Sequence, residues 1–142
     1  KPGILILELT ESSLLEVSQQ TVKTIAELQS YGVSLALDDF GAGYSSLKYL
    51  QTLPVILIKI DRGFICNIQK NQNEAAIVKA IVSLTNALEI DVIAEGVETK
   101  EHVDVVTELG CDLMQGFYIS KPLSVAELEK FIEKSDSVFM VE

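Results

Sequence analysis

Short apolar runs alternate with longer amphipathic segments along this 142-residue chain. The apolar runs predict β-strands over residues 4–8, 33–38, 56–60, 92–94 and 113–117. The amphipathic segments predict helices over residues 18–31, 46–50, 73–88, 100–109 and 124 to about 133. Thr99 and Ser124 are suited to cap the start of two helices, Gly110 is suited to end the helix that Thr99 begins, and Gly32 is suited to end the helix over residues 18–31. The chain is therefore predicted to alternate strands with helices.

This alternation predicts an α/β fold with a parallel sheet and right-handed crossovers. The predicted strands are apolar throughout, as expected where helices or other strands cover both faces of a sheet. Two architectures fit this pattern. One is an open, doubly wound sheet, and the other is a (β/α)8 barrel.

The net charge of the chain argues against one class of binding partner. There are 21 acidic residues against 11 Lys and Arg, for a formal net charge of -10. Such a surface repels polyanions, so a nucleic-acid polymer is not an expected partner. No run of about 18 apolar residues is present, so we expect no membrane contact by this segment. Cys66 and Cys111 lack the spacing of metal ligands, and we interpret both as reduced core or near-core thiols of a cytosolic protein.

Polar residues stand at the end of every predicted strand, so we expect them at the same height in the sheet. They are Glu8, the pair Asp38 and Asp39, Lys59, Glu95 and Gln115. In a barrel such residues converge over one face. An open sheet would spread them over roughly 20 Å, because neighbouring strands lie about 4.8 Å apart. The convergence of these polar groups favours the barrel.

Several carboxylates on one rim repel each other unless a positive charge lies among them. Their hard oxygen atoms suit Mg²⁺ or Mn²⁺. Two such ions activate water and stabilise a leaving oxygen in phosphodiester hydrolysis. Gly41 and Gly43 follow the two aspartates and allow a sharp turn and close approach of a substrate. The glycine turn alone is a weak dinucleotide signal, because the third glycine of that motif is missing.

Five motifs occur in an order and spacing typical of one family: ELTE, LDDFGAGYSSL, IKID, AEGVET and QGFYISKPL. From about Ile4 to Phe131 the chain resembles the C-terminal part of the bacterial EAL domain. Members of that family hydrolyse the second messenger cyclic di-GMP to linear pGpG. The resemblance implies a TIM-like (β/α)8 barrel with one antiparallel strand, of which this chain supplies about the last five βα units. We expect residues 1–134 to form this portion and residues 135–142 to form a tail.

The resemblance also implies roles for individual residues. Those matching metal ligands of a two-metal Mg²⁺ or Mn²⁺ site are Glu8, Asp38, Asp39 and Glu95. Those matching catalytic residues are Asp39, which also positions the attacking water, Lys59, which lies near that water, and the supporting acid Glu98. Those matching substrate-binding or supporting residues are Glu11, which fixes the loop after the aspartates, Gln115, Gly41 and Gly43.

The Glu-Ala-Leu motif and a metal-binding Asn of the family are absent from these residues. Both belong to the N-terminal part of the domain, so we expect the chain to be a piece of a longer protein and inactive alone. The resemblance further implies a homodimer formed through the EAL domain and an upstream sensory or GGDEF domain. It also implies a cytoplasmic protein, or a cytoplasmic domain of a membrane-anchored bacterial protein.

Three functions are compatible with the family. The first is a cyclic di-GMP phosphodiesterase, the second a receptor that binds cyclic di-GMP without cleaving it, and the third a dimerisation scaffold. The matching acids and Lys59 favour the enzyme. A serine nucleophile is disfavoured, because Ser45 and Ser46 are not in a G-x-S-x-G turn and His102 is predicted to lie on a helix.

Overall fold

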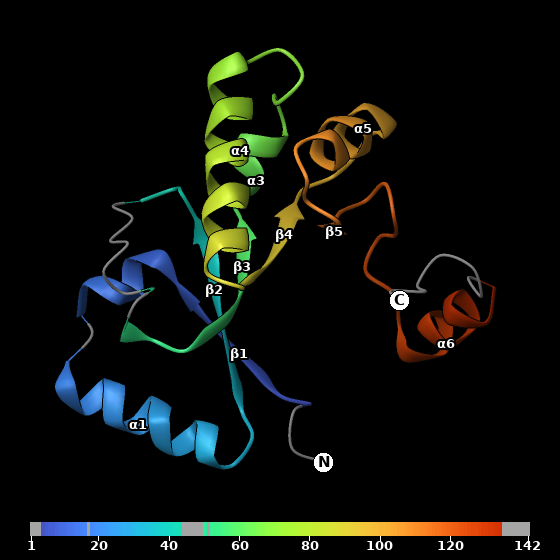
Figure 1. The fold of residues 1–142 in the computed structure, drawn as a ribbon. Coiled ribbons are helices and arrows are strands. Elements are labelled where there is room, and N and C mark those ends of the chain that lie inside the picture. The colour runs from blue at the N-terminus through green and yellow to red at the C-terminus, as the bar shows by residue number, and fades with distance from the viewer. Residues whose placement is uncertain (1–3, 17, 44–49, 51, 135–142) are drawn as a thin grey trace.

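A computed structural model describes residues 4–16, 18–43, 50 and 52–134. Within these residues, five parallel strands form one twisted sheet in chain order (Figure 1). The strands are β1 (Ile6–Thr10), β2 (Ser34–Phe40), β3 (Val55–Ile60), β4 (Asp91–Glu95) and β5 (Leu113–Gln115). The predicted parallel α/β sheet is therefore confirmed.

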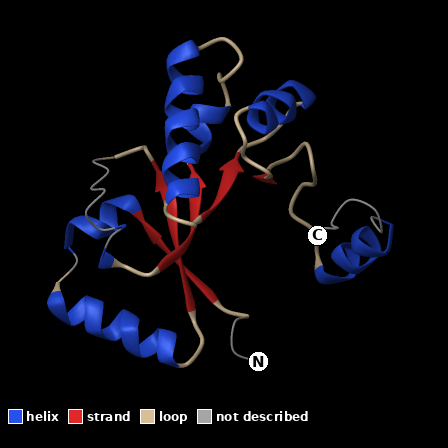
Figure 2. Ribbon diagram, viewed as in Figure 1, coloured by secondary structure: helices blue, strands red, loops and turns tan. Residues whose placement is uncertain are grey.

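Described helices follow β1, β3, β4 and β5, and all of them except the last pack beside the sheet (Figure 2). They are the 3-10 helix η1 (Glu11–Glu16), α1 (Gln19–Ser30), α3 (Arg62–Ile65), α4 (Gln72–Ala87), α5 (Lys100–Glu108) and α6 (Val125–Lys134). The predicted starts of three helices are accurate. Ser18 and Thr99 each accept a backbone N–H from the first turn, and Ser124 donates its own N–H and hydroxyl to the Glu127 carboxylate. No described helix is both long and apolar enough to cross a bilayer.

The core lies between the sheet and α4. Ile58 and Ile60 of the central strand β3 are fully buried, as are Leu37 of β2 and Val78 of α4. Burying side chains of this size is worth about 1.5–3 kcal/mol each relative to leaving them exposed. The packing of this apolar layer fixes β2, β3 and β4 relative to one another, and these three strands carry most of the candidate site.

The strand ends differ from the predicted ones in three places. The β1 ladder begins where Ile6 pairs with Ser34 and runs to Thr10, so Glu8 lies inside the strand. β2 continues through both aspartates to Phe40. β5 is shorter than predicted, because Gly116 lies against the Val97 backbone, where a Cβ would fall 2.1 Å from the Val97 oxygen. The elements η1 and α3 were not predicted, and most of the expected helix over residues 46–50 lies outside the described residues.

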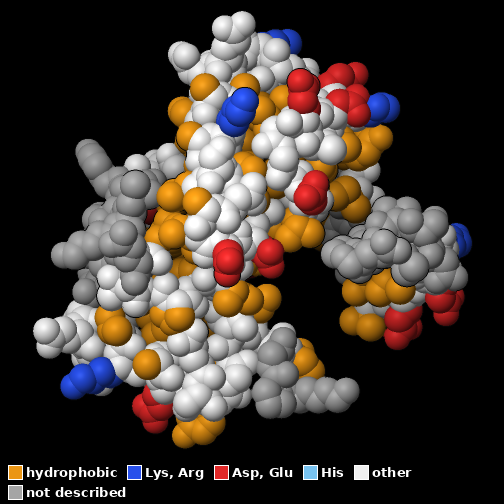
Figure 3. Space-filling view, in the orientation of Figure 1, with side chains coloured by type: hydrophobic (Ala, Val, Ile, Leu, Met, Phe, Trp, Pro, Cys, Tyr) orange, Lys and Arg blue, Asp and Glu red, His pale blue; other side chains and the backbone are white. Residues whose placement is uncertain are grey.

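The sheet is open within the described residues, since β1 pairs only with β2 and β5 only with β4. Ile4, Leu5 and Ile6 on the β1 edge are 75%, 56% and 42% exposed. Helix α6 lies apart from the sheet and has no buried residue (Figure 1). Hydrophobic side chains gather on α6 in Figure 3, where Leu128 and Ile132 are 46% and 56% exposed. An unpaired apolar edge is a template for association.

We predict that purified residues 1–142 self-associate through the β1 edge. Light scattering should give a mass that rises with protein concentration. Ile6→Lys should reduce this association, because a charge on an edge strand opposes pairing. Ile77→Lys on α4 is the matched control, since Ile77 has the same 42% exposure as Ile6. A monomer at all concentrations, with sharp thermal unfolding, would contradict the prediction.

Candidate metal centre

One buried lysine gathers three carboxylates at the site. Lys59 of β3 is 7% exposed. Its Nζ lies 2.8 Å from Glu95 Oε1, 3.0 Å from Asp38 Oδ1 and 3.1 Å from Glu8 Oε2. These acids come from β4, β2 and β1, so a single ammonium group joins four strands of the sheet.

The sheet register explains how these side chains meet. Glu8 is level with Ala36, two residues before Asp38 on the neighbouring strand. Lys59 is level with Ile93, two residues before Glu95. The four residues are therefore not at one height, contrary to the simplest form of the prediction. The long side chains of Glu8 and Lys59 cover the offset, and the charged groups still converge.

The carboxylates hold Lys59 in its protonated form. Burial acts to lower its pKa, but hydrogen bonds from its ammonium to Glu95, Asp38 and Glu8 raise the pKa above the ordinary value for lysine. One positive charge among three carboxylates leaves the cluster negative. The site can therefore accept a further cation.

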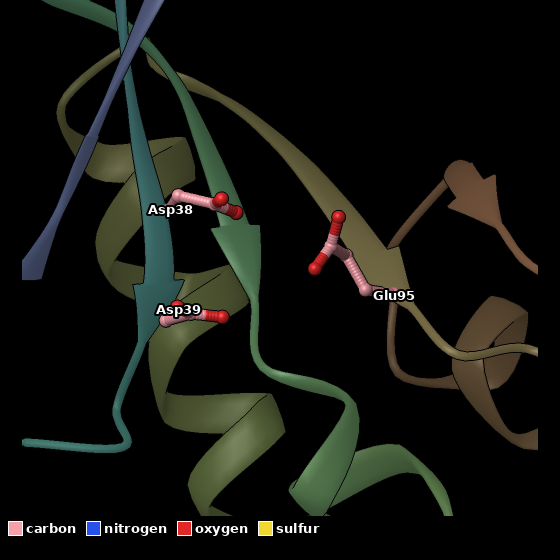
Figure 4. A group of neighbouring side chains, drawn as sticks. All are labelled: Asp38, Asp39 and Glu95. Atoms are coloured by element: carbon pink, nitrogen blue, oxygen red, sulfur yellow. The ribbon is translucent and has the colours of Figure 1, made fainter.

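Asp38 and Asp39 are consecutive in β2, and neighbouring side chains of a regular strand point to opposite faces. The ladder between β2 and β3 is irregular between Leu37 and Phe40, and Asp39 has a φ of 54°. Aspartate tolerates this left-handed conformation better than most residues. The irregularity turns both carboxylates toward Glu95 (Figure 4).

The result is a cluster that fits a metal ion. Asp38, Asp39 and Glu95 each offer a carboxylate oxygen, and these oxygens lie within 4.8 Å of one another. Anionic oxygen ligands at this spacing suit a hard divalent cation such as Mg²⁺ or Mn²⁺. Glu8 reaches the same centre through Lys59 rather than as a member of this cluster.

The turn after the aspartates is held by Glu11. This residue lies in η1, is 4% exposed, and accepts hydrogen bonds at 3.0 Å from the N–H groups of Gly41 and Gly43. Gly41 has a φ of 97°, and a Cβ there would lie 2.8 Å from the Phe64 ring. A residue with a side chain would strain this turn, which lies directly beside Asp39.

Glu98 and Gln115 line a cavity on the other side of Glu95. This cavity has a volume of about 210 Å³, and its other lining residues are Arg62, Gly96, Gly116 and Phe117. Neither Glu98 nor Gln115 forms an ion pair with Lys59. Arg62 and Phe117 were not among the predicted site residues. Their signals were weak, since Arg62 merely follows the IKID motif and Phe117 reads as a strand residue.

Known proteins resemble this chain in sequence. The model of the EAL domain family matches residues 1–122. The chain belongs to the EAL domain family. MucR of Pseudomonas aeruginosa, a bifunctional diguanylate cyclase and cyclic di-GMP phosphodiesterase, is 43% identical over 128 residues, which are 90% of this chain and 19% of MucR. The cyclic di-GMP phosphodiesterase NbdA of the same organism is 44% identical over 126 residues, covering 89% of this chain and 16% of NbdA.

Solved EAL structures confirm the fold class. The MucR phosphodiesterase in complex with cyclic di-GMP superposes with a TM-score of 0.83 at 43% identity, over 89% of this chain and 51% of that one. BlrP1 of Klebsiella pneumoniae gives 0.81 at 37% identity, over 86% of this chain and 31% of BlrP1. BlrP1 was solved with cyclic di-GMP and either calcium or manganese. The five strands of this EAL domain are thus part of a TIM-like barrel.

In this EAL domain, Lys59→Met should destabilise the metal-free protein, because three acids would lose their shared counter-charge. We expect the free energy of unfolding to fall by about 3 kcal/mol. This is the low end of the cost of breaking a buried ion pair, because the Glu8 side chain is 46% exposed. Thermal unfolding in EDTA measures this. Lys79→Met on the exposed face of α4 removes the same charge elsewhere and should change stability little.

The pH dependence of this effect has a definite sign. The folded pKa of Lys59 is raised, so its contribution is fully present below the unfolded pKa of about 10.4 and is lost as pH rises through the folded pKa. The difference in stability between wild type and Lys59→Met should be constant from about pH 7 to 9 and shrink only above about pH 10.5. A difference that already shrinks between pH 7 and 9 would contradict the ion-pair assignment.

Proposed function

We propose that the protein containing this chain is a metal-dependent phosphodiesterase that hydrolyses cyclic di-GMP to linear pGpG. The observation that carries this proposal is the convergence of Asp38, Asp39 and Glu95 beside Lys59. Family membership supports it, as do the printed activities of MucR and NbdA. The cyclic di-GMP bound in the MucR structure supports the choice of substrate.

Asp38, Asp39 and Glu95 would hold divalent metal together with Glu8, which is adjacent to them through Lys59. We infer Mg²⁺ or Mn²⁺ in a two-metal site, in line with the manganese of the BlrP1 structure. Such ions lower the pKa of bound water and stabilise negative charge on a leaving oxygen. Asp39 is the most exposed of the three acids and can accept a hydrogen bond from the attacking water.

Lys59 acts as a cation and hydrogen-bond donor in this proposal, and not as a general base. Its raised pKa keeps it protonated at neutral pH, and an ammonium has donors only. The group is buried, so its charge acts with little screening by solvent on oxygens that enter the site. Its donors can move from the carboxylates to a phosphate oxygen when metal takes over neutralisation of the acids.

The remaining residues shape the space around the metal centre. Glu11 holds the turn of Gly41 and Gly43 on one side of Asp39, next to a cavity of about 190 Å³. Glu98 and Gln115 border the cavity on the Glu95 side. We propose that substrate lies across both cavities, with Glu98 as a supporting acid of the catalytic centre.

This chain spans 19% of MucR, 16% of NbdA and about half of the MucR phosphodiesterase structure. The activity therefore belongs to a longer protein in our proposal. We infer a homodimer formed through the EAL domain and an upstream sensory or GGDEF domain. Cys111 is buried as predicted, whereas Cys66 is exposed, contrary to the prediction of a core thiol. Both are free thiols, which supports a cytoplasmic location in our proposal. We propose that the EAL portion of this chain comprises residues 1–134 and that residues 135–142 form a tail.

Asp38→Asn in the full-length protein should lower the rate of cyclic di-GMP hydrolysis by about three orders of magnitude or more, because it removes a charged metal ligand. Formation of pGpG measured by chromatography at saturating Mn²⁺ gives the rate. Asp91→Asn is the matched control, since Asp91 is exposed at the opposite end of β4. Wild-type turnover in Asp38→Asn would refute the assignment. Binding of cyclic di-GMP without cleavage by the wild type would favour a receptor.

Residues 1–142 alone should show no measurable hydrolysis. The Glu-Ala-Leu motif and the metal-binding Asn of the family are absent from these residues, so two of the expected metal ligands are missing. The assay is pGpG formation by the purified chain with Mn²⁺, and Asp39→Ala in the same chain detects contaminating activity. Turnover that disappears in Asp39→Ala would show that the chain is sufficient.

A further inference from the structure

The single histidine of the chain is buried where the loop after β4 enters α5. His102 is 6% exposed, and its Nδ1 accepts a hydrogen bond of 3.2 Å from the backbone N–H of Glu98. Since Nδ1 is the acceptor, we assign the ring proton to Nε2. This side chain therefore acts on a residue that borders the proposed catalytic centre.

The contact differs from an ordinary helix cap. Thr99 is the N-cap of α5, and its hydroxyl accepts the backbone N–H of His102 at 3.2 Å. In a capping box the third helical residue reaches back to the backbone of the N-cap itself. His102 reaches one residue further, to Glu98. Its side chain thus restrains the loop that precedes the helix.

The rest of this loop is held by other elements. Gly96 has a φ of 73°, and a Cβ there would lie 2.6 Å from Arg62 Cβ. Val97 is fully buried, donates its N–H to Gln115 at 3.1 Å, and accepts from the N–H of Tyr118 at 3.0 Å. Among the described contacts, the Glu98 amide is held only by His102. Glu95 to Val97 are therefore fixed by α3 and β5, and Glu98 by the imidazole.

Glu98 has two spaces open to its exposed side chain. One is the cavity of about 210 Å³ beside Glu95 and Gln115. The other is a cavity of about 300 Å³ on the α5 side, where Cys66, Asn67 and His102 are among the lining residues. The backbone conformation at Glu98 sets the direction of its Cα–Cβ bond and the rotamers open to it, and so biases which space its carboxylate enters. A hydrogen bond that fixes the Glu98 amide therefore also limits which cavity the Glu98 carboxylate enters.

We propose that His102 is a positioning residue that acts through the Glu98 amide and keeps the Glu98 carboxylate at the cavity beside Glu95. The inference rests on the proposed phosphodiesterase function for its effect on rate, but the restraint itself is independent of that function. A helix-capping role alone would affect stability and leave turnover unchanged.

The test is a double-mutant cycle in the full-length protein, with His102→Leu, Glu98→Ala and the double variant. Leucine keeps a buried apolar side chain but offers no acceptor. His102→Asn is the conservative rescue, because an asparagine oxygen occupies the position of Nδ1 relative to the backbone. Hydrogen exchange by mass spectrometry on peptides covering residues 95–99 reports the restraint directly. Melting temperatures show whether each variant folds.

His102→Leu should lower kcat/KM for cyclic di-GMP by about 10- to 100-fold, as is typical for loss of a partner that orients a site residue. His102→Asn should recover most of the loss. His102→Leu should cost nothing further in the Glu98→Ala background. Exchange over residues 95–99 should accelerate in His102→Leu and return toward wild type in His102→Asn.

Three results would overturn the proposal: wild-type kinetics in a folded His102→Leu, a full additional loss on top of Glu98→Ala, or unchanged exchange over residues 95–99. If the wild-type protein itself does not hydrolyse cyclic di-GMP, the proposed function fails instead. Hydrogen exchange in His102→Leu and His102→Asn then still tests whether His102 positions Glu98, because that measurement does not depend on catalytic turnover.

Discussion

The site depends on one electrostatic constraint, which is the presence of several carboxylates around a point where few positive charges are available. The chain as a whole is acidic, and Lys59 is the buried cation among Glu8, Asp38 and Glu95. Without a counter-charge these acids would repel each other in a poorly solvated place. With only one ammonium they remain collectively negative. The same arrangement therefore stabilises the metal-free fold and attracts divalent cations.

The irregular backbone of β2 places the two aspartates on the same side of the sheet. A regular β2 would place Asp38 and Asp39 on opposite faces, and the left-handed conformation at Asp39 brings both to one side. The adjoining turn is held across the sheet by Glu11, whose carboxylate binds two backbone amides. Local strain at the aspartates is thus accompanied by fixed hydrogen bonds on the next residues.

Much of the fold follows from local sequence signals. Helix starts were predicted well because Ser18, Thr99 and Ser124 make their capping bonds within a few residues. Strand ends were predicted less well because they depend on pairing between strands. The β1 ladder is set by the position of β2, and β5 ends where Gly116 meets Val97. Such contacts join residues far apart in sequence, so periodicity does not reveal them.

In the candidate site, too, some features could be predicted from the sequence and others depend on contacts between distant residues. The motif residues Asp38, Lys59 and Glu95 are brought together, as predicted, although their roles remain proposals. The irregularity that makes Asp38 and Asp39 neighbours was not visible in the sequence. His102 was regarded only as a helix residue, because its bond to Glu98 requires burial and a particular ring orientation. Charged motif residues are easier to predict than the neutral groups that orient them.

The sequential order of the sheet has a consequence for folding. Each strand pairs with its immediate predecessor in the chain, so the site grows one βα unit at a time. During synthesis the acids of β1 and β2 emerge first, Lys59 next and Glu95 last. An intermediate that ends after β3 already contains the ammonium between Glu8 and Asp38, and its acids are partly neutralised before the last ligand arrives. The order of charges along the chain therefore brings Glu8 and Asp38 together before their cation, but it supplies that cation before Glu95 adds a further negative charge.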